Sequence, residues 1–284
     1  MAKLIADISK HNGTVAMATM AKKVDGLIIR AGYRSAGSGT LTTDPKWATN
    51  IKNAVKQGIP VGVYWWTTAK STTEAKTEAA YLLELIKGYN LSFPIWLDLE
   101  YYNSKRTGRA DKLSKANRTK YAVAFLEAIE AAGYDAGVYC NVDFWSDALD
   151  NSQLLTYARW IAHYASSCSV SCDMWQYTSS ARGSTYGAES SGLDLSHCYT
   201  DFIGGAKSKF ATATTEEESH DMDTLRKGDK GQQVRALQML LGGLTVDGIF
   251  GTDTESAVKA WQNNYGLTAD GIVGPLTWGA ILGG

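Results

Sequence analysis

Short apolar runs rich in Ile, Val, Tyr and Trp recur through the first 200 residues of the chain. Runs of this length, with β-branched and aromatic side chains, are typical of buried strands. The pattern predicts eight strands, at residues 4–9, 26–33, 59–68, 93–100, 135–140, 159–164, 173–179 and 193–199.

Helical patterns separate the early strands, and the clearest places Tyr121, Phe125 and Ile129 four residues apart on one helix face. The first five strands thus alternate with helices, as in parallel βα units, whereas the last three follow one another with little helix between them. The sequence predicts an α/β fold: an irregular βα barrel of eight strands with an incomplete helical ring. The expected helices lie at about residues 45–57, 73–87 and 118–133.

The apolar pattern is lost at residues 207–224, where small, polar and acidic residues give the composition of a linker. Beyond it, the motif L-T-x-D-G-I-x-G occurs twice at a spacing of 23 residues, and each copy precedes a helix start. We expect a small all-α bundle of three helices, with Trp261 in its core. The predicted domains are the barrel at 1–206, the linker at 207–224 and the helical domain at 225–284.

The charges of the chain nearly cancel, with 28 basic against 29 acidic residues, so the composition indicates neither nucleic acid nor an anionic membrane as partner. No run approaches the roughly 18 apolar residues of a membrane span, and the N-terminus has no apolar stretch of signal-peptide length. We therefore expect no membrane insertion and synthesis in the cytoplasm without a signal peptide. The cysteines lack zinc-site spacing: Cys140, Cys168, Cys172 and Cys198. We expect them to be reduced and mostly buried, and a local pair of Cys168 and Cys172 is the alternative.

Two carboxylates end the apolar run FPIWLDLE, at Asp98 and Glu100. Side chains two apart in a strand point the same way, with their Cα atoms roughly 6.5 to 7 Å apart, so the two acids share a face. Leu97 and Leu99 then point toward the helices. In a barrel, the carboxyl ends of the strands form the active-site face.

Asp7 ends the first predicted strand and Asp194 lies in the eighth, and these two strands meet where the barrel closes. Four carboxyl groups are therefore expected to converge. A structural role is the alternative, because acids after strands often cap the next helix. Clustered acids, however, raise one another's pKa, which keeps a proton on one and a charge on another near neutral pH. Glycoside hydrolysis requires such a pair.

Other catalytic classes are poorly supported by the residues. The chain has four histidines and no H-E-x-x-H, so a zinc peptidase lacks an obvious ligand set. Cys140 could be a nucleophile paired with His163, although a buried apolar cysteine explains it equally well. No phosphate-binding G-x-x-x-x-G-K-[ST] occurs. We expect no metal and no cofactor.

The motifs resemble, in order, those of the family 25 glycoside hydrolases, which are N-acetylmuramidase lysozymes. They cover about residues 3–203: ADISKHNG, IIRAGY, GIPVGVYWW, PIWLDLE, AGVYC, WIAHY, MWQYTSS and LDLSHCYTDF. The resemblance implies that Glu100 is the general acid and that Asp98, Asp7 and Asp194 are the other active-site acids. It also implies three substrate-facing aromatic residues, Tyr64, Trp66 and Tyr139. Two positions depart from the family pattern, Trp65 and Ser196.

Residues 225–282 resemble the three-helix peptidoglycan-binding domain, through KGDKGQQVRALQ, DGIFGTDTESAVKAWQ and DGIVGPLTW. An enzyme joined to a wall-binding domain is the arrangement of phage endolysins and autolysins. The resemblance therefore implies a lysozyme that cleaves the β-1,4 bond between N-acetylmuramic acid and N-acetylglucosamine, with bacterial peptidoglycan as partner. Without a signal peptide, such an endolysin reaches the wall through a separate membrane pore. The alternatives are a non-catalytic wall-binding protein and a chitinase-like glycosidase.

Overall fold

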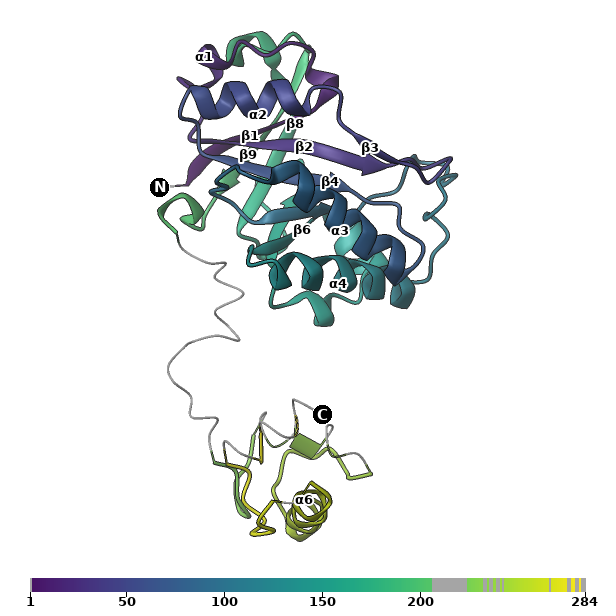
Figure 1. Cartoon of the computed structure of the whole chain (residues 1–284). Helices are drawn as coiled ribbons and strands as arrows, with labels where there is room; N and C mark the ends of the chain where they lie inside the picture. Colours follow the sequence, from purple (N-terminus) through teal and green to yellow (C-terminus); the bar gives the residue numbers. More distant parts are fainter. Residues whose placement is uncertain are drawn as a thin grey trace. The chain divides into compact units, whose positions relative to one another are not determined.

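A computed structural model describes residues 2–205, 224–231, 234, 237, 238, 241, 243–265, 267–274, 277, 278 and 281. The chain divides into two compact units, residues 1–214 and 215–284, and each is described by itself (Figure 1). The predicted linker at 207–224 lies outside the described residues apart from Thr224.

The strands of the N-terminal unit form one mixed sheet, in the order β1-β9-β8-β7-β6-β5-β4-β2-β3. A further pairing of β1 with β2 closes eight of these strands into a barrel. The strands are β1 (Lys3–Ile8), β2 (Gly26–Arg34), β3 (Leu41–Thr43), β4 (Val61–Trp66), β5 (Ile95–Asp98), β6 (Ala136–Asn141), β7 (Ala158–Ala162), β8 (Met174–Arg182) and β9 (Gly192–Cys198).

The predicted eight-stranded barrel is confirmed, with two differences. The short strand β3 was not predicted; it pairs antiparallel with the end of β2. The last barrel strand, β9, runs antiparallel to both β8 and β1. This reversal brings the start of β9 to the end of β1, and it sets Asp7 opposite Asp194.

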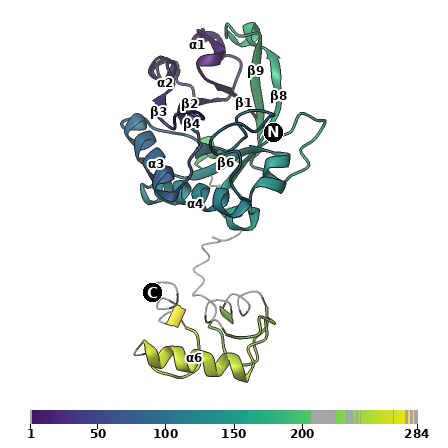
Figure 2. The ribbon, with the colours of Figure 1, turned by 90° about the vertical axis from the view of Figure 1, so that its right-hand side faces the viewer.

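Helices cover only part of the barrel, as predicted. Ser71 and Ser114 cap two of them, each accepting a hydrogen bond from the backbone N–H three residues later. Only short helical turns connect β6 to β9, and Figure 2 shows β8 and β9 at one side of the unit, away from α3 and α4. The helices are α1 (Met17–Met20), α2 (Trp47–Lys56), α3 (Thr72–Ile86) and α4 (Lys115–Ala131), and the turns are Lys10–Asn12, Phe144–Ala148, Asn151–Leu154, Gly183–Tyr186 and Phe202–Gly204.

Strand β5 shows how the sequence separates the two sides of the barrel wall. Ile95 and Leu97 join the apolar layer beneath the helices, whereas Trp96 packs inside the barrel. The Trp96 ring meets the Trp160 ring at 5.6 Å between centroids. A Cβ at Gly137 would lie 2.5 Å from the Trp96 ring, so only glycine fits there. These large rings fill the barrel interior, and Asp98 follows Trp96 on the same inner face.

The C-terminal unit contains α6 (Thr252–Asn264), and the further helical residues that the structure describes there are 234, 237, 238, 241, 277, 278 and 281. This agrees with the predicted small helical domain. The placement of Trp261 in its core is wrong, because Trp261 is half-buried and stacks on Tyr265, which is 55% exposed. The core consists of Leu225, Val234, Leu237, Phe250, Val258, Val273 and Trp278.

The two repeats fold around equivalent glutamines. The Nε2 atom of Gln238 donates to Asp247 Oδ1 and to the carbonyl of Ile249, and its Oε1 accepts from the backbone N–H of Gly248. Gln262 makes the same bonds one repeat later, to Asp270, Ile272 and Gly271. The repeated D-G-I therefore marks a turn that is held by a buried amide.

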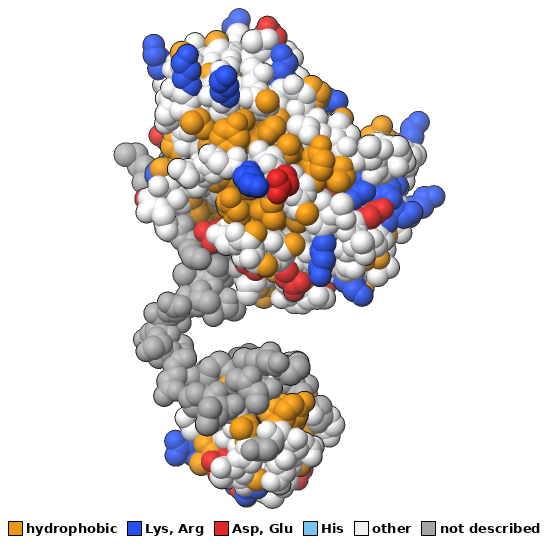
Figure 3. Space-filling view, viewed as in Figure 1, with side chains coloured by type: hydrophobic (Ala, Val, Ile, Leu, Met, Phe, Trp, Pro, Cys, Tyr) orange, Lys and Arg blue, Asp and Glu red, His pale blue; other side chains and the backbone are white. Residues whose placement is uncertain are grey.

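No helix in the described part of the chain is long and apolar enough to cross a membrane. On the face drawn in Figure 3, acidic and basic side chains are interspersed with apolar and uncharged groups. This mixture agrees with the formal net charge of −1.

Candidate active site

The four predicted acids come from three strands that meet at one end of the barrel. Asp7 lies in β1 and faces Asp194 across the β1–β9 pair. Asp98 ends β5, and Glu100 follows two residues later. Asp7 and Asp98 are buried, Asp194 is half-buried and Glu100 is exposed. The structure therefore brings all four carboxyl groups into one site.

Asp7 and Asp194 form a carboxyl pair. Burial raises the pKa of Asp7 well above its usual range, and the neighbouring Asp194 charge raises it further. Burial also raises the pKa of Asp194, while a hydrogen bond from Asp7 lowers it. Two adjacent carboxyl groups of this kind share one proton near neutral pH. The directions of the shifts favour the proton on Asp7 and the charge on Asp194.

Asp98 and Glu100 form the second pair. Burial raises the pKa of Glu100 to about 7, and the Asp194 charge contributes in the same direction. Although water reaches the Glu100 carboxyl, protein surrounds it on several sides and weakens the solvation of its charge. Burial also raises the pKa of Asp98, and the neighbouring Glu100 charge raises it further. Among the described residues, Asp98 Oδ1 has no hydrogen-bond partner.

Arg30 on β2 is a cation of the site that sequence reasoning missed. Its Nε donates to Asp44 Oδ2 at 2.8 Å, and its charge lowers the pKa of both Asp98 and Glu100. Its Nη2 is buried without a hydrogen-bond partner in the described part of the chain. The run IIRAGY contained the signal, because a charged residue inside an apolar strand must find a counter-charge.

One cleft extends from Glu100 over β2 and β4, with a volume of about 480 Å³. We call it the aromatic cleft. The Trp66 ring stacks on the Tyr102 ring at 6.2 Å between centroids, and the tilted Tyr33 ring lies 6.1 Å from the Trp66 ring. Flat exposed rings of this kind suit the apolar faces of sugars. Its lining includes Lys10, His11, Arg30, Tyr33, Tyr64, Trp66, Asp98, Glu100 and Tyr102.

A second cleft extends from Glu100 over β6 and β7, with a volume of about 500 Å³. We call it the polar cleft. Its lining consists of Glu100, Tyr139, Asn141, Val142, Asp143, Ala162, His163 and Tyr164. Glu100 thus borders both clefts. Of the predicted substrate-facing residues, Tyr64 and Trp66 line the aromatic cleft and Tyr139 lines the polar one.

Gln176 on β8 is a second residue that sequence reasoning missed. It is 2% exposed and lies between Asp7 and two tyrosines. Its Nε2 donates to Asp7 Oδ2 at 3.0 Å, and its Oε1 accepts from the hydroxyls of Tyr139 and Tyr164, each at 2.9 Å. The motif MWQYTSS drew attention to this strand, but a buried amide has no periodic signature.

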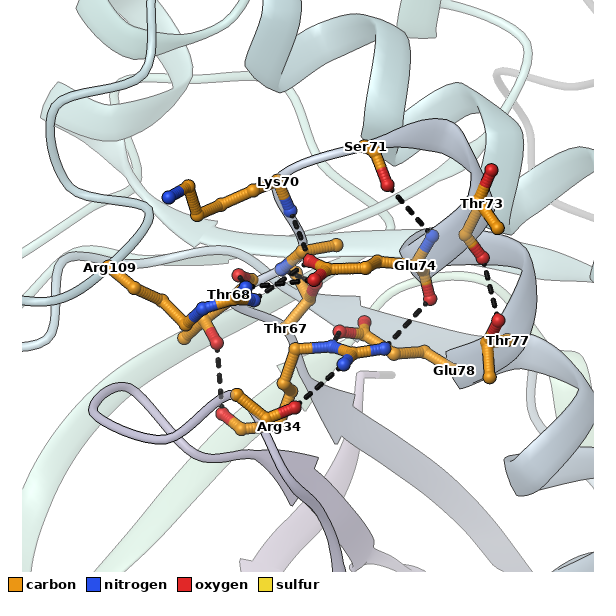
Figure 4. A network of polar contacts seen from close by, with 12 residues as sticks. Arg34, Thr67, Thr68, Lys70, Ser71, Thr73, Glu74, Thr77, Glu78 and Arg109 are labelled. Carbon is orange, nitrogen blue, oxygen red and sulfur yellow. Dashed lines mark hydrogen bonds and ion pairs between the residues drawn. The ribbon is translucent and has the colours of Figure 1, made fainter.

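A network of ion pairs fixes the loops behind the aromatic cleft (Figure 4). Arg34 Nε donates to Glu78 at 2.5 Å, and its other nitrogens donate to the carbonyls of Gly39 and Glu74. Arg109 donates through both terminal nitrogens to Glu74, each at 2.8 Å. The network therefore joins the loops that follow β2, β4 and β5, and residues of the first and the third of these loops line the cleft.

The thiol alternative is wrong. Cys140 points to the apolar layer under the helices, and burial raises the pKa of its thiol well above the usual range. The Nδ1 of His163 accepts a hydrogen bond from the backbone N–H of Ser169. The four cysteines are free. Within the described residues, no group of three or more His, Cys, Asp or Glu side chains is arranged to hold a metal ion.

Comparison with known families agrees with this geometry. The model of glycosyl hydrolases family 25 matches residues 6–185, which is more than half of the chain. The chain belongs to glycosyl hydrolases family 25. The predicted glycoside hydrolase is thereby confirmed. Residues 230–281 of this family 25 enzyme match a putative peptidoglycan binding domain.

Several relatives of this family 25 enzyme are characterised. The autolytic lysozyme of Clostridium acetobutylicum is 29% identical over 266 residues, which cover 87% of this chain and 70% of that protein. The structure of the modular autolysin LytC from Streptococcus pneumoniae, in complex with a synthetic peptidoglycan ligand, has 32% identity and a TM-score of 0.61. That match covers 70% of this chain and 47% of LytC. The CTP1L endolysin has 28% identity and a TM-score of 0.59, covering 75% and 71%.

Proposed function

We propose that this family 25 enzyme is a β-1,4-N-acetylmuramidase that cleaves peptidoglycan between N-acetylmuramic acid and N-acetylglucosamine. The main support is Glu100, whose pKa is raised to about 7 and whose side chain borders both clefts. A glycan lying across Glu100 has sugars in each cleft and a protonated carboxyl at the bond between them. The lysozyme named among the relatives supports the same substrate.

In this proposal, Glu100 donates its proton to the departing glycosidic oxygen. Asp98 orients and polarises the 2-acetamido group of muramic acid so that its oxygen attacks the anomeric carbon, or stabilises the oxocarbenium charge directly. Asp98 must be ionised for this role, although burial raises its pKa. The charge of Arg30 lowers that pKa and supports the ionised form.

The remaining site residues bind the substrate. Asp7 and Asp194 hold the sugar and the attacking water beside the reacting carbon. Tyr64, Trp66 and Tyr139 contact the sugar rings through their faces and edges. All five lie on strands of the barrel, which are rigid enough to fix the substrate in a reactive geometry.

Mass spectrometry of digested peptidoglycan tests the proposal. After borohydride reduction, the products should have new reducing ends on N-acetylmuramic acid. New ends on N-acetylglucosamine would contradict the proposal, and equally fast cleavage of chitin would favour the chitinase-like alternative. If the folded protein cleaves neither polymer, the non-catalytic wall-binding alternative replaces it.

We propose further that residues 225–284 bind peptidoglycan, which the family match at 230–281 supports. Tethering raises the effective substrate concentration without changing the chemical step. A chain that ends at Phe210 should therefore cleave soluble glycan fragments at the full rate and clear intact walls more slowly. Equal loss on soluble fragments would show that the two units are not independent. A folded fragment 220–284 that fails to sediment with purified sacculi would contradict wall binding.

We infer that the enzyme acts as an endolysin, reaching the wall through a separate membrane pore, and the similarity to the CTP1L endolysin supports this role. Expression in a susceptible bacterium tests it. Lysis should require co-expression of a pore-forming protein, and lysis by the enzyme alone would overturn the requirement.

A further inference from the structure

Gln176 occupies an unusual position for a buried amide, because all three of its hydrogen bonds go to side chains of the active site. Two partners, Tyr139 and Tyr164, line the polar cleft, and the third is Asp7. By contrast, Gln238 and Gln262 in the C-terminal unit bind backbone groups of turns. Those two glutamines hold a fold together, whereas Gln176 connects functional groups.

The chemistry of the amide fixes the direction of each bond. The Oε1 of Gln176 can only accept, so the hydroxyls of Tyr139 and Tyr164 must both donate to it. Each hydroxyl has a single proton, which is thereby used. The tyrosine oxygens can offer only lone pairs to the polar cleft. The Nε2 of Gln176 can only donate, so Asp7 Oδ2 is an acceptor and any proton on Asp7 is on Oδ1.

Tyr139 lies among the carboxyl groups of the active site, so the direction of its hydrogen bond affects the site. Burial raises the pKa of Tyr139, and the nearby charges of Glu100, Asp98 and Asp7 raise it further. A tyrosine among carboxylates would ordinarily donate to one of them. Gln176 removes that option, because its Oε1 accepts the hydroxyl proton. Tyr164, which is 59% exposed, is held in the same way at the outer part of the cleft.

We propose that Gln176 is a positioning residue that makes the two tyrosines of the polar cleft hydrogen-bond acceptors for an uncharged sugar. The tyrosine lone pairs and the Asp143 carboxylate accept from hydroxyl groups and from an acetamide N–H, and Asp143 repels a carboxylate. Of the two sugars that alternate in peptidoglycan, only N-acetylglucosamine lacks the lactyl group and its acidic peptide. The polar cleft therefore takes N-acetylglucosamine, an assignment that rests on the proposed muramidase function.

The aromatic cleft has the opposite character. Two cations, Lys10 and Arg30, lie in its lining against one ionised acid, Asp98, apart from the shared Glu100. Lys10 stands over the Tyr33 ring at 5.3 Å. Cations at this end suit the acidic substituent of muramic acid. The two clefts thus differ in charge on either side of Glu100, and this difference gives the glycan one direction of binding.

A double-mutant cycle between Gln176→Met and Tyr164→Phe tests the proposal in the full chain. One neutral hydrogen bond corresponds to roughly a 2- to 13-fold effect. We expect each single variant to lower kcat/KM on soluble peptidoglycan fragments by about tenfold and to weaken competitive inhibition by tri-N-acetylglucosamine equally. In the Gln176→Met background, Tyr164→Phe should cost little more, because the freed hydroxyl no longer presents its lone pairs.

Two further variants separate positioning from folding. Thr119→Val removes a buried hydroxyl of α4 that lies away from both clefts. This hydroxyl donates to the Lys115 carbonyl and accepts from the backbone N–H of Asp150. The variant should lower the free energy of unfolding without changing KM. Gln176→Glu retains the acceptor for both tyrosines, so Tyr164→Phe should keep its tenfold effect in that background even if Gln176→Met fails to fold.

Two results would overturn the proposal: additive effects of Gln176→Met and Tyr164→Phe, or unchanged tri-N-acetylglucosamine inhibition in Tyr164→Phe. Both are measured on variants of an enzyme whose wild type releases muramic acid reducing ends. A wild type that releases none would instead refute the proposed function.

Discussion

Two groups of charged side chains lie in the barrel unit, and they are built differently. In the active site, four carboxyl groups face one arginine, and the pKa of every one of these acids is raised. Behind the aromatic cleft, arginines and glutamates are equal in number: Arg34 with Glu78, and Arg109 with Glu74 (Figure 4). The Arg109 hydrogen bonds lower the pKa of Glu74 to about 2.

The difference separates a structural role from a chemical one. Paired charges satisfy one another and hold three loops in place, so they need no proton exchange. Unpaired acids oppose folding when ionised, and a fold retains them where the chemistry needs a proton near neutral pH. Glu78 combines features of the two groups: it is paired with Arg34, yet its full burial raises its pKa to about 7.

The largest expected effect is on catalysis. Glu100→Gln removes the proton donor, so cleavage of peptidoglycan should fall roughly 10²- to 10⁴-fold. The loss should shrink on an aryl glycoside whose leaving group departs without a proton. Steady-state rates on both substrates measure the effect. Near-normal wall lysis by Glu100→Gln would remove Glu100 from the proposed role.

Asp98→Asn is the matched variant, because it changes the neighbouring acid on the same strand face. Its role concerns the sugar side of the bond, so the activated leaving group should not restore its rate. Equal rescue of the two variants would mean that their roles are not distinct.

The second effect is on stability and concerns the paired group. Arg34→Met leaves Glu78 buried without its cation and frees the Gly39 and Glu74 carbonyls. Breaking a buried pair costs about 3 to 5 kcal/mol, and we expect a value near the lower end because Glu78 can take up a proton. Denaturant unfolding measures it. Lys3→Met, at the exposed Lys3–Asp201 pair, is the control and should leave the free energy of unfolding nearly unchanged.

Sequence reasoning predicted the acid cluster because period-two alternation in β5 is strong. Trp96 and Asp98 share the inner face, whereas Ile95 and Leu97 are outside. The same reasoning found every barrel strand, since each is an apolar run. It did not predict the antiparallel direction of β9, because strand direction depends on partners far away in sequence. The Asp7–Asp194 register follows from that direction.

The polar partners of the site could not be predicted from the sequence. Gln176 acts through a contact with Asp7 on another strand, and Arg30 acts through a contact with Asp44, which follows β3. Neither contact has a fixed spacing along the chain. Trp261 is an error of the opposite kind. Its helical spacing with Val258 predicted a buried side chain, but Trp261 is only half-buried in the structure. A helix face is wider than the core it meets, and Tyr265 at its edge remains exposed.

The third expected effect is a gain in stability. The pKa of Glu100 is about 7 in the folded state against 4.5 for an ordinary glutamate. The folded state therefore binds more protons between these values, and stability is lost as pH rises from about 4.5 to 7. Glu100→Gln removes this loss, so at pH 8 the variant should be more stable by about 1 kcal/mol after screening by solvent. Equal pH dependence of unfolding in both proteins would show that Glu100 titrates normally.

The smallest effect tests the link between the two kinds of charge. Arg30 is paired with Asp44, yet its charge also lowers the pKa of Glu100. In Arg30→Gln/Asp44→Asn the pair is replaced by neutral groups, which avoids leaving Asp44 buried alone. A cation favours the ionised form of a carboxyl, so removal of the Arg30 charge should raise the pKa of Glu100.

Because Glu100 must be protonated to act, the alkaline limb of the pH–activity profile should move to higher pH. We expect a shift of about half a pH unit, which corresponds to about 0.7 kcal/mol of interaction with the charge. Rates on soluble fragments from pH 5 to 9 measure the shift. Movement of that limb to lower pH would mean that Arg30 does not act on Glu100 through its charge.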